Sequence, residues 1–165
     1  TDGKKYYDRD GNVVIKNFCD KDWTAIKRLR AIGIPVLFIT GDPYNEMILS
    51  NRNLPTIVNR GEGFHRDKIN FLPQALEEYN CTADEVVYFG DDLFDYKIME
   101  GVGYAYCVND SPRSLQDISV PLHCNGGENA IMYLFEELED RELIPTVPAG
   151  DVMAKIYELD LKEKF

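Results

Sequence analysis

The stretch Val86-Val87-Tyr88-Phe89-Gly90-Asp91-Asp92-Leu93-Phe94-Asp95 decides the fold of this chain. Its β-branched and aromatic residues predict a short buried strand that ends at Gly90 and is followed at once by two carboxylates, with a third at Asp95. In an open parallel sheet, ligands bind outside the carboxyl ends of the strands, and Mg²⁺ is held by one or two carboxylates with water and substrate phosphate. The same residues are also typical of a polar loop in which Asp92 caps a helix that begins near Leu93. The stretch alone leaves both interpretations open.

Length and composition predict one globular domain. The chain has 165 residues, of which 44% are hydrophobic and 28% charged, and these fractions are ordinary for a domain with a real core. Its formal net charge of -11 argues against nucleic acid and anionic membranes as partners, because both would repel its surface. The sequence shows no membrane span, signal peptide or CxxC pair, so we expect a cytoplasmic protein with four reduced cysteines.

Apolar strands and amphipathic helices alternate along the chain. The pattern predicts a hairpin around Asp10-Gly11, strands at 34–39, 56–58, 86–90 and 104–108, and helices at 20–33, 44–53, 67–76, 111–118 and 128–143. Because each strand is almost uniformly apolar, the predicted fold class is α/β, with a Rossmann-like parallel sheet covered by helices on both faces. The last segment, 151–165, is either a terminal helix on the same core or an arm that docks on this or a neighbouring subunit.

Three polar motifs follow apolar strands or open a helix: Thr40-Gly41, Asp67-Lys68 and Gly90-Asp91-Asp92. A hydroxyl, an ammonium group and a carboxylate cluster are complementary in phosphoryl transfer, because they donate to the phosphoryl oxygens, neutralise charge and hold a metal ion. Each motif by itself is weak evidence for phosphoryl transfer, whereas the order and spacing of the three together are fairly specific for it.

In this order the motifs resemble those of the haloacid dehalogenase superfamily. Its capless branch, which contains KDO 8-phosphate phosphatase and the domain fused to acylneuraminate cytidylyltransferases, is the more similar part. The resemblance runs from Thr1-Asp2-Gly3 to the helix after Gly127 and includes 33–41 and 101–103. It implies a single domain over residues 1–165, with the hairpin 4–18 as a flap, 145–165 as a C-terminal arm or helix, and no separate cap domain.

The resemblance also implies the roles of individual residues. Thr40 would donate to the phosphoryl oxygens, Gly41 would allow close backbone approach, and Lys68 would pair with the phosphate and the nucleophile. Asp91 would ligate Mg²⁺ directly, while Asp92 and Asp95 would bind metal waters or orient Lys68. The implied reaction is hydrolysis of a small phosphorylated metabolite, such as a sugar or sugar-acid phosphate, through an aspartyl-phosphate intermediate.

The family's first motif, Asp-x-Asp at the end of a strand, lies just before the Thr-Asp-Gly that opens this chain. It supplies the nucleophile and the general acid/base, so we expect an upstream strand that carries it, without which this chain is inactive. Asp8-Arg9-Asp10-Gly11 matches the motif by letters. It follows no long apolar strand and leaves no room for the flap before Thr40, so we interpret it as the hairpin turn.

Two positions depart from the KDO 8-phosphate phosphatase pattern. Asp42 stands where an Arg usually follows Thr-Gly, and Met132 stands where an Arg follows the Gly-Gly motif. Both losses argue against KDO 8-phosphate itself as the substrate, since Arg grips carboxylates bidentately. Arg60, His65 and Arg66, in a longer loop, are candidate replacements, with Arg60 the preferred substrate contact; solvated loop charges are the alternative for all three.

The resemblance further implies a homotetramer in which the hairpin 4–18 completes a neighbouring active site. Exposed Tyr6 and Tyr7 would suit that interface, although packing of the hairpin on its own sheet is an equal alternative. Two other functions stay open: a catalytically inert oligomerisation module, which loss of both arginines favours, and a receiver-like or flavodoxin-like binding domain. Retention of Thr40, Lys68 and Asp91 favours the enzyme.

Overall fold

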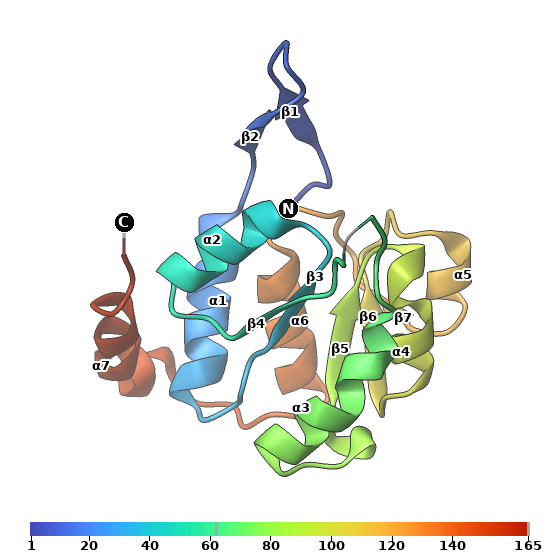
Figure 1. Cartoon of the computed structure of the whole chain (residues 1–165). Helices are drawn as coiled ribbons and strands as arrows, with labels where there is room; N and C mark the ends of the chain where they lie inside the picture. The colour runs from blue at the N-terminus through green and yellow to red at the C-terminus, as the bar shows by residue number, and fades with distance from the viewer. Residues whose placement is uncertain (62, 165) are drawn as a thin grey trace.

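The computed structural model describes residues 1–61 and 63–164, so Glu62 in the loop after residue 58 and the terminal Phe165 lie outside the described residues. It confirms the α/β class, with parallel strands flanked by helices (Figure 1). Strands β3 (Phe38–Thr40) and β4 (Thr56–Val58) pair in parallel, as do β5 (Val87–Gly90), β6 (Tyr104–Cys107) and β7 (Val120–Pro121). The helices are α1 (Asp20–Ala31), α2 (Pro43–Asn51), α3 (Leu72–Tyr79), α4 (Tyr96–Glu100), α5 (Arg113–Gln116), α6 (Ala130–Asp140) and α7 (Ala149–Asp160). Short 3-10 helices are η1 (Lys68–Phe71), η2 (Ala83–Glu85) and η3 (Leu93–Asp95).

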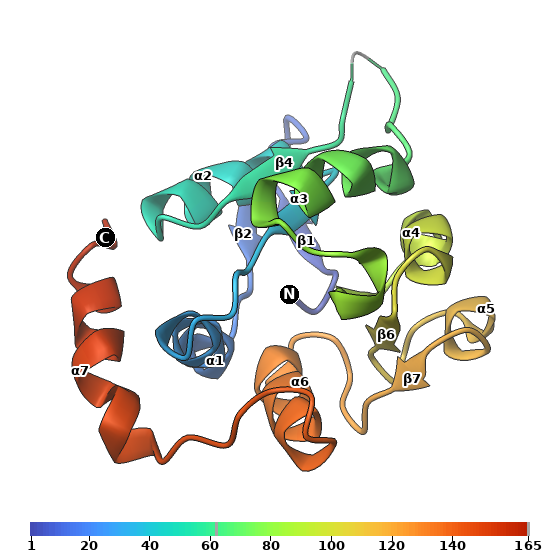
Figure 2. The same cartoon turned by 90° about the horizontal axis from the view of Figure 1, so that it is seen from below.

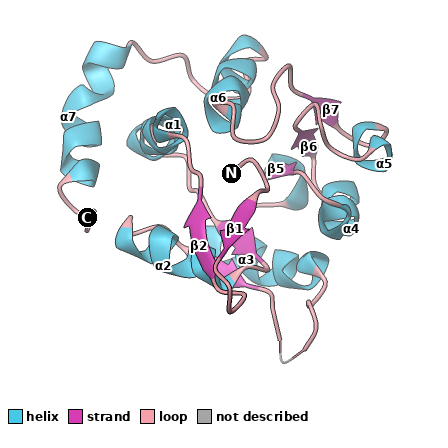
Figure 3. Cartoon of the chain, turned by 90° about the horizontal axis from the view of Figure 1, so that it is seen from above, coloured by secondary structure: helices cyan, strands magenta, loops and turns pink. Residues whose placement is uncertain are grey.

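The central strand β6 shows why its sheet needs helices on both faces. Successive side chains of a strand point to opposite faces. Tyr106 is buried in the cluster formed with residues of α1 and α6, whereas its neighbour Cys107 is buried against Met99 of α4 and Leu115 of α5. Figure 3 shows the same arrangement, with α6 on one side of β5, β6 and β7 and with α4 and α5 on the other.

Among the described residues, the parallel strands form two separate sheets, β3–β4 and β5–β6–β7, instead of one. No ladder joins β3 to β5, and in Figure 2, seen from below, β4 lies apart from β6 and β7. The predicted strand 34–39 is accordingly shorter, because only Phe38–Thr40 has a partner, the three residues of β4. The fold therefore keeps two parallel edges facing each other across a gap.

Sequence signals for helix ends are mostly confirmed. Gly33 follows α1 with φ of +89°, a left-handed conformation that glycine adopts without a Cβ clash. The expected helix from Asp67 is divided into η1 and α3, because Pro73 fits only the first turn of an α-helix. Helix α6 begins at Ala130, two residues later than predicted, after Asn129 in a left-handed conformation.

An antiparallel hairpin, β1 (Lys5–Tyr7) and β2 (Val13–Lys16), projects from the body of the molecule (Figure 1). Asp8 closes its turn, because its carboxylate accepts the N–H groups of Asp10 at 2.9 Å and Asn12 at 2.8 Å. The structure thus agrees with the hairpin-turn interpretation of Asp8-Arg9-Asp10-Gly11.

Helix α7 packs against α1 of the same chain, as a terminal helix on the same core would. It buries Val152, Ile156 and Leu159, and the buried Lys27 of α1 pairs with Asp160. Within the described residues, no helix combines the length and apolar character that crossing a membrane requires. All four cysteines are free.

Candidate active site

A buried carboxylate, Asp95, is the centre of a polar network at the end of β5. The residue is only 1% exposed. Its Oδ1 accepts hydrogen bonds from Nζ of Lys68 at 2.5 Å and from the hydroxyl of Tyr88 at 2.6 Å, and its Oδ2 accepts the backbone N–H groups of Asp91 and Asp92, both at 3.2 Å. A carboxylate is stable in such a place only when it is paired and hydrogen-bonded. The network fixes Lys68 beside the end of β5.

Gly90 is required by the close approach of this network. A Cβ atom added to Gly90 would lie 2.6 Å from Cγ of Asp95, well inside van der Waals contact. The glycine before the paired carboxylates therefore leaves the space that the Asp95 side chain fills.

The two carboxylates after Gly90 have different surroundings. Asp92 accepts the N–H of Leu93 at 2.6 Å and caps η3, so the helix-cap interpretation holds for this residue. The side chain of Asp91 has no hydrogen bond or ion pair with the described residues. Although much of the residue is exposed, the pKa of its carboxyl is raised, mainly because neighbouring protein atoms displace water and then because of the charge of Asp95; Lys68 offsets part of this effect.

These surroundings fit one ligand of a hard divalent cation. Removal of water raises the pKa of the Asp91 carboxyl, and the charge of Asp95 raises it further, so a bound cation would stabilise the ionised carboxylate. Mg²⁺ is commonly held by one or two carboxylates, with water and phosphate oxygens completing its shell. No group of three or more His, Cys, Asp or Glu side chains within residues 1–61 and 63–164 is arranged to hold a metal ion. Asp91 is thus a candidate single ligand and not a member of a preformed cluster.

Thr40, at the end of β3, lies in a second polar network. Its Oγ1 accepts hydrogen bonds from Nδ2 of Asn45 at 2.9 Å and from the backbone N–H of Asp42 at 3.2 Å. Asp42 caps α2 through the N–H of Tyr44, at 3.0 Å, with Pro43 in the first turn. The hydroxyl of Thr40 is therefore held at the start of α2.

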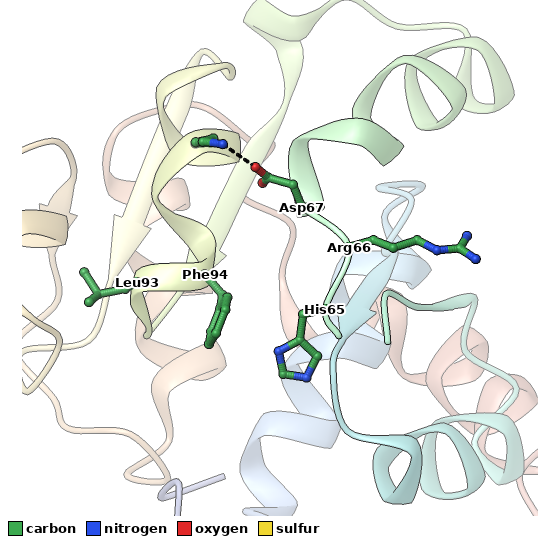
Figure 4. A pocket seen from close by; sticks show the side chains of 6 residues that line it. His65, Arg66, Asp67, Leu93 and Phe94 are labelled. Carbon is green, nitrogen blue, oxygen red and sulfur yellow. Dashed lines mark hydrogen bonds and ion pairs between the residues drawn. The ribbon is translucent and has the colours of Figure 1, made fainter. Parts of the chain in front are cut away.

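The loop after β4 contributes His65 to this region but not Arg60. The imidazole of His65 packs edge-on against Phe94, with ring centroids 5.0 Å apart, and a Cβ on Gly41 would lie 3.0 Å from its Nε2. The exposed side chain of Arg60 makes no hydrogen bond or ion pair with the described residues. In Figure 4, Arg66 points away from His65 and Phe94. A hollow of about 220 Å³ here is lined by His65, Arg66, Asp67, Leu93, Phe94 and Lys97.

A groove of about 240 Å³ lies between β3 and β5. Asn45, which holds Thr40, and Asp91 both line it, so the loops after the two strands open on one space. Its other walls are largely apolar; residues that line it include Thr1, Phe18, Trp23, Ile26, Phe38, Leu49, Phe89, Gly90, Val108, Gly126, Gly127, Ala130 and Ile131. The groove therefore combines an apolar channel between two strand edges with a polar end.

Three residues of these networks were not predicted as site residues: Tyr88, Asn45 and Lys16. The position of Tyr88 could have been predicted, because residues two apart in a strand point to the same face and Tyr88 lies two residues before Gly90. Asn45 and Lys16 are 29 positions apart, and their contact depends on how the hairpin meets α2, which no local pattern encodes.

Comparison with known proteins places the chain among relatives with these motifs. Residues 64–132 match the model of the haloacid dehalogenase-like hydrolase family. The chain is 29% identical over 150 residues to the 3-deoxy-D-manno-octulosonate 8-phosphate phosphatase KdsC of Haemophilus influenzae, covering 85% of this chain and 74% of that protein. It is 30% identical over 133 residues to KdsC of Yersinia pestis, covering 79% of this chain and 69% of that protein.

A solved structure shows the same fold. The 3-deoxy-D-manno-octulosonate 8-phosphate phosphatase of Moraxella catarrhalis, in complex with a magnesium ion, a phosphate ion and a KDO molecule, has a TM-score of 0.72 at 20% identity, over 84% of this chain and 79% of that one. With the family match and the sequence relatives, we conclude that the chain belongs to the haloacid dehalogenase-like hydrolases, in the group of the 3-deoxy-D-manno-octulosonate 8-phosphate phosphatases, which are phosphoric monoester hydrolases.

Proposed function

We propose that the full-length protein is a Mg²⁺-dependent phosphatase that hydrolyses a small phosphorylated metabolite, a sugar or sugar-acid phosphate, through an aspartyl-phosphate intermediate. The observation that carries the proposal is the Lys68–Asp95 ion pair beside Asp91, whose carboxylate has no hydrogen bond with the described residues. Asp91 lines the same groove as Asn45, and Asn45 donates a hydrogen bond to Thr40. An ammonium group, a hydroxyl donor and a free carboxylate form the set that stabilises a transferring phosphoryl group.

Each residue has a distinct part in the proposed reaction. Lys68, held by Asp95, neutralises charge on the phosphate, and the Thr40 hydroxyl donates to a phosphoryl oxygen. Gly41 leaves room for the His65 imidazole beside Thr40, so a substrate phosphate that approaches the backbone here would also meet His65. Asp91 would hold Mg²⁺, which when bound supplies positive charge that neutralises the phosphoryl group as it transfers.

We also propose that the groove receives a strand from upstream of Thr1, which carries the Asp-x-Asp motif. Its support is the gap itself: two parallel edges, β3 and β5, face each other without a common partner among the described residues, and apolar side chains line the space between them. Unpaired strand edges favour pairing with a further strand. A strand parallel to both would bring its carboxyl end beside Asp91 and Thr40, where the nucleophile is needed.

For the substrate, we propose a sugar or sugar-acid phosphate other than KDO 8-phosphate itself. The position after Gly41 offers no free cation to a substrate carboxylate, because Asp42 there engages Lys5 and Lys16, both at 2.8 Å. His65, whose Nε2 would lie 3.0 Å from a Cβ on Gly41, is a candidate substrate contact beside Arg60.

For the assembly, we propose a homotetramer in which the hairpin 4–18 packs on a neighbouring copy. Four apolar side chains of the hairpin are more than half exposed: Tyr6, Tyr7, Val14 and Ile15. A two-stranded hairpin is marginal without a packing surface, so a partner would stabilise it. Light scattering of the full-length protein tests this proposal, and a monomer at micromolar concentration contradicts it.

A phosphatase screen tests the function. The full-length protein is assayed against a panel of sugar and sugar-acid phosphates, with Mg²⁺ or with EDTA, beside the Asp91→Asn variant. We expect Mg²⁺-dependent release of phosphate that the variant largely loses. Turnover that Asp91→Asn leaves unchanged would refute the metal assignment, and no turnover on any substrate would favour the inert oligomerisation module.

A further inference from the structure

The loop between β3 and α2 is tied to the base of the hairpin by a chain of hydrogen bonds. Nζ of Lys16 lies 2.8 Å from Oδ2 of Asp42 and 2.5 Å from Oδ1 of Asn45, and Nζ of Lys5 reaches the same Oδ2 at 2.8 Å. The side chain of Lys16 is only 4% exposed, so its ammonium group depends on these partners. Partial burial raises the pKa of Asp42, but the bonds from Lys16 and Lys5 outweigh it and lower that pKa to about 2.

Lys16 determines which way the Asn45 amide faces. An ammonium group can only donate hydrogen bonds, so the atom of Asn45 that faces Lys16 has to be the acceptor oxygen, Oδ1. The amide nitrogen then faces the opposite way, 2.9 Å from Oγ1 of Thr40, to which it donates. The chemistry of Lys16 thereby removes the usual ambiguity of an Asn side chain.

Thr40 is consequently left with one role. A hydroxyl offers two acceptor lone pairs and one proton. Donors occupy both acceptor positions, the Asn45 amide at 2.9 Å and the Asp42 backbone N–H at 3.2 Å. The Thr40 proton has no acceptor among these groups, so it is left to donate to another acceptor, such as a phosphoryl oxygen.

We propose that Asn45, anchored by Lys16, is a positioning residue that sets Thr40 as a hydrogen-bond donor to the substrate phosphoryl group. The inference rests on the proposed phosphatase function and adds to it a residue outside the family motifs. Asn45 acts through Thr40 and does not itself touch the reacting atoms. The hairpin, through Lys16, thereby takes part in organising its own chain's active site.

Asn45→Asp and Asn45→Ala separate this role from a structural one. The new carboxylate of Asn45→Asp keeps Lys16 as a partner but only accepts, so it takes the Thr40 proton away from the substrate. In the full-length protein, with p-nitrophenyl phosphate and Mg²⁺, we expect kcat to fall about 100-fold, the loss seen when a positioned donor is removed. Asn45→Ala, which leaves the proton free to rotate, should fall less. A merely structural role predicts the opposite order, because Asn45→Ala loses both hydrogen bonds.

A second experiment combines Thr40→Val with Asn45→Asp. If Asn45 acts through Thr40, then adding Asn45→Asp to Thr40→Val lowers kcat no further, since the proton is already absent. Asn51→Asp, at an exposed position of the same helix, makes the same charge change away from the site and should match the wild type. A full additional loss in the double variant, or a larger loss in Asn45→Ala than in Asn45→Asp, overturns the inference.

Binding of inorganic phosphate keeps the test independent of turnover. By calorimetry with Mg²⁺ present, Thr40→Val and Asn45→Asp should each weaken phosphate binding about tenfold or more, because each loses a hydrogen bond to a charged group. A protein without turnover that still shows this pattern refutes the proposed function and supports the inference. Phosphate binding that Asn45→Asp leaves unchanged, or no phosphate binding by the wild type, refutes the inference.

Discussion

Nζ of Lys68 lies 2.5 Å from Oδ1 of Asp95, which is almost fully buried and shares that oxygen with the hydroxyl of Tyr88. The pair joins η1 to η3 across 27 positions of sequence. Its two charges are removed from water together, so each stabilises the other only while both are present. We therefore expect Asp95 to contribute to stability, apart from its proposed part in the site.

Asp95→Asn should destabilise the protein by about 3 kcal/mol, because it leaves the Lys68 charge unpaired in a buried place. Urea unfolding followed by circular dichroism measures the change. Asp92→Asn is the matched control: the residue is exposed, and Asn caps a helix about as well as Asp, so little change is expected. Equal stabilities for Asp95→Asn and Asp92→Asn would contradict the assigned role of the pair.

Gly90→Ala should cost about 1–3 kcal/mol, the usual price of overpacking a rigid site. The added Cβ would lie 2.6 Å from Cγ of Asp95, and four hydrogen bonds hold that side chain in place. Gly150→Ala, in α7, has nothing within 4 Å of the new atom and should leave the protein as stable or slightly more stable. Thermal unfolding compares the stabilities of the two variants. If Gly90→Ala is as stable as the wild type, the close packing of Asp95 against Gly90 is contradicted.

Asp42→Asn should lower stability at pH 7 by about 1–2 kcal/mol, since it removes the charge that Lys16 and Lys5 bind but keeps the helix cap. The pKa of Asp42 is lowered to about 2 from an ordinary value of 3.8. A lowered pKa gives stability above the unfolded pKa, which is lost as pH falls through the folded one. The difference between wild type and variant should therefore be constant above about pH 5 and shrink between pH 4 and pH 2. A difference that grows on acidification would contradict the ion pairs.

Asp91→Asn should raise the Mg²⁺ concentration needed for half-maximal activity by at least about tenfold, because it replaces a charged ligand by a neutral one. Removing the metal with EDTA should abolish turnover in both proteins, and added Mg²⁺ should restore it. Asp110→Asn offers an exposed control, since within residues 1–61 and 63–164 the one hydrogen bond its carboxylate accepts is from the N–H of Gly126. An unchanged Mg²⁺ requirement in Asp91→Asn would remove this residue from the metal site.

The elements that the sequence predicted well are those in which local chemistry decides the outcome. The strand before Gly90, the hairpin turn at Asp10-Gly11 and the end of α1 at Gly33 all depend on a few adjacent residues. The length of β3 was wrong, because a strand extends only as far as its partner, and β4 pairs with three residues.

The candidate site divides in the same way, into residues that the local sequence predicts and contacts that depend on distant segments. Thr40, Lys68, Asp91 and Asp95 follow from strand ends and motif order, and the structure brings Lys68 to Asp95 as expected. Their assigned roles in catalysis and metal binding remain predictions. The Lys16–Asn45 contact could not be predicted from the sequence, since it depends on how segments distant in the chain meet.

The ammonium group of Lys16, at the base of the hairpin, has two structural roles. Lys16 belongs to the strand that leads out to the exposed apolar side chains of the hairpin, and the same Nζ fixes Asn45 beside Thr40. A force or a binding event that tilts the hairpin is therefore transmitted to the Thr40 hydroxyl through only two hydrogen bonds. The proposed assembly and the proposed turnover would then be coupled through these bonds, and substitutions at the hairpin tip should be assayed for rate as well as for oligomeric state.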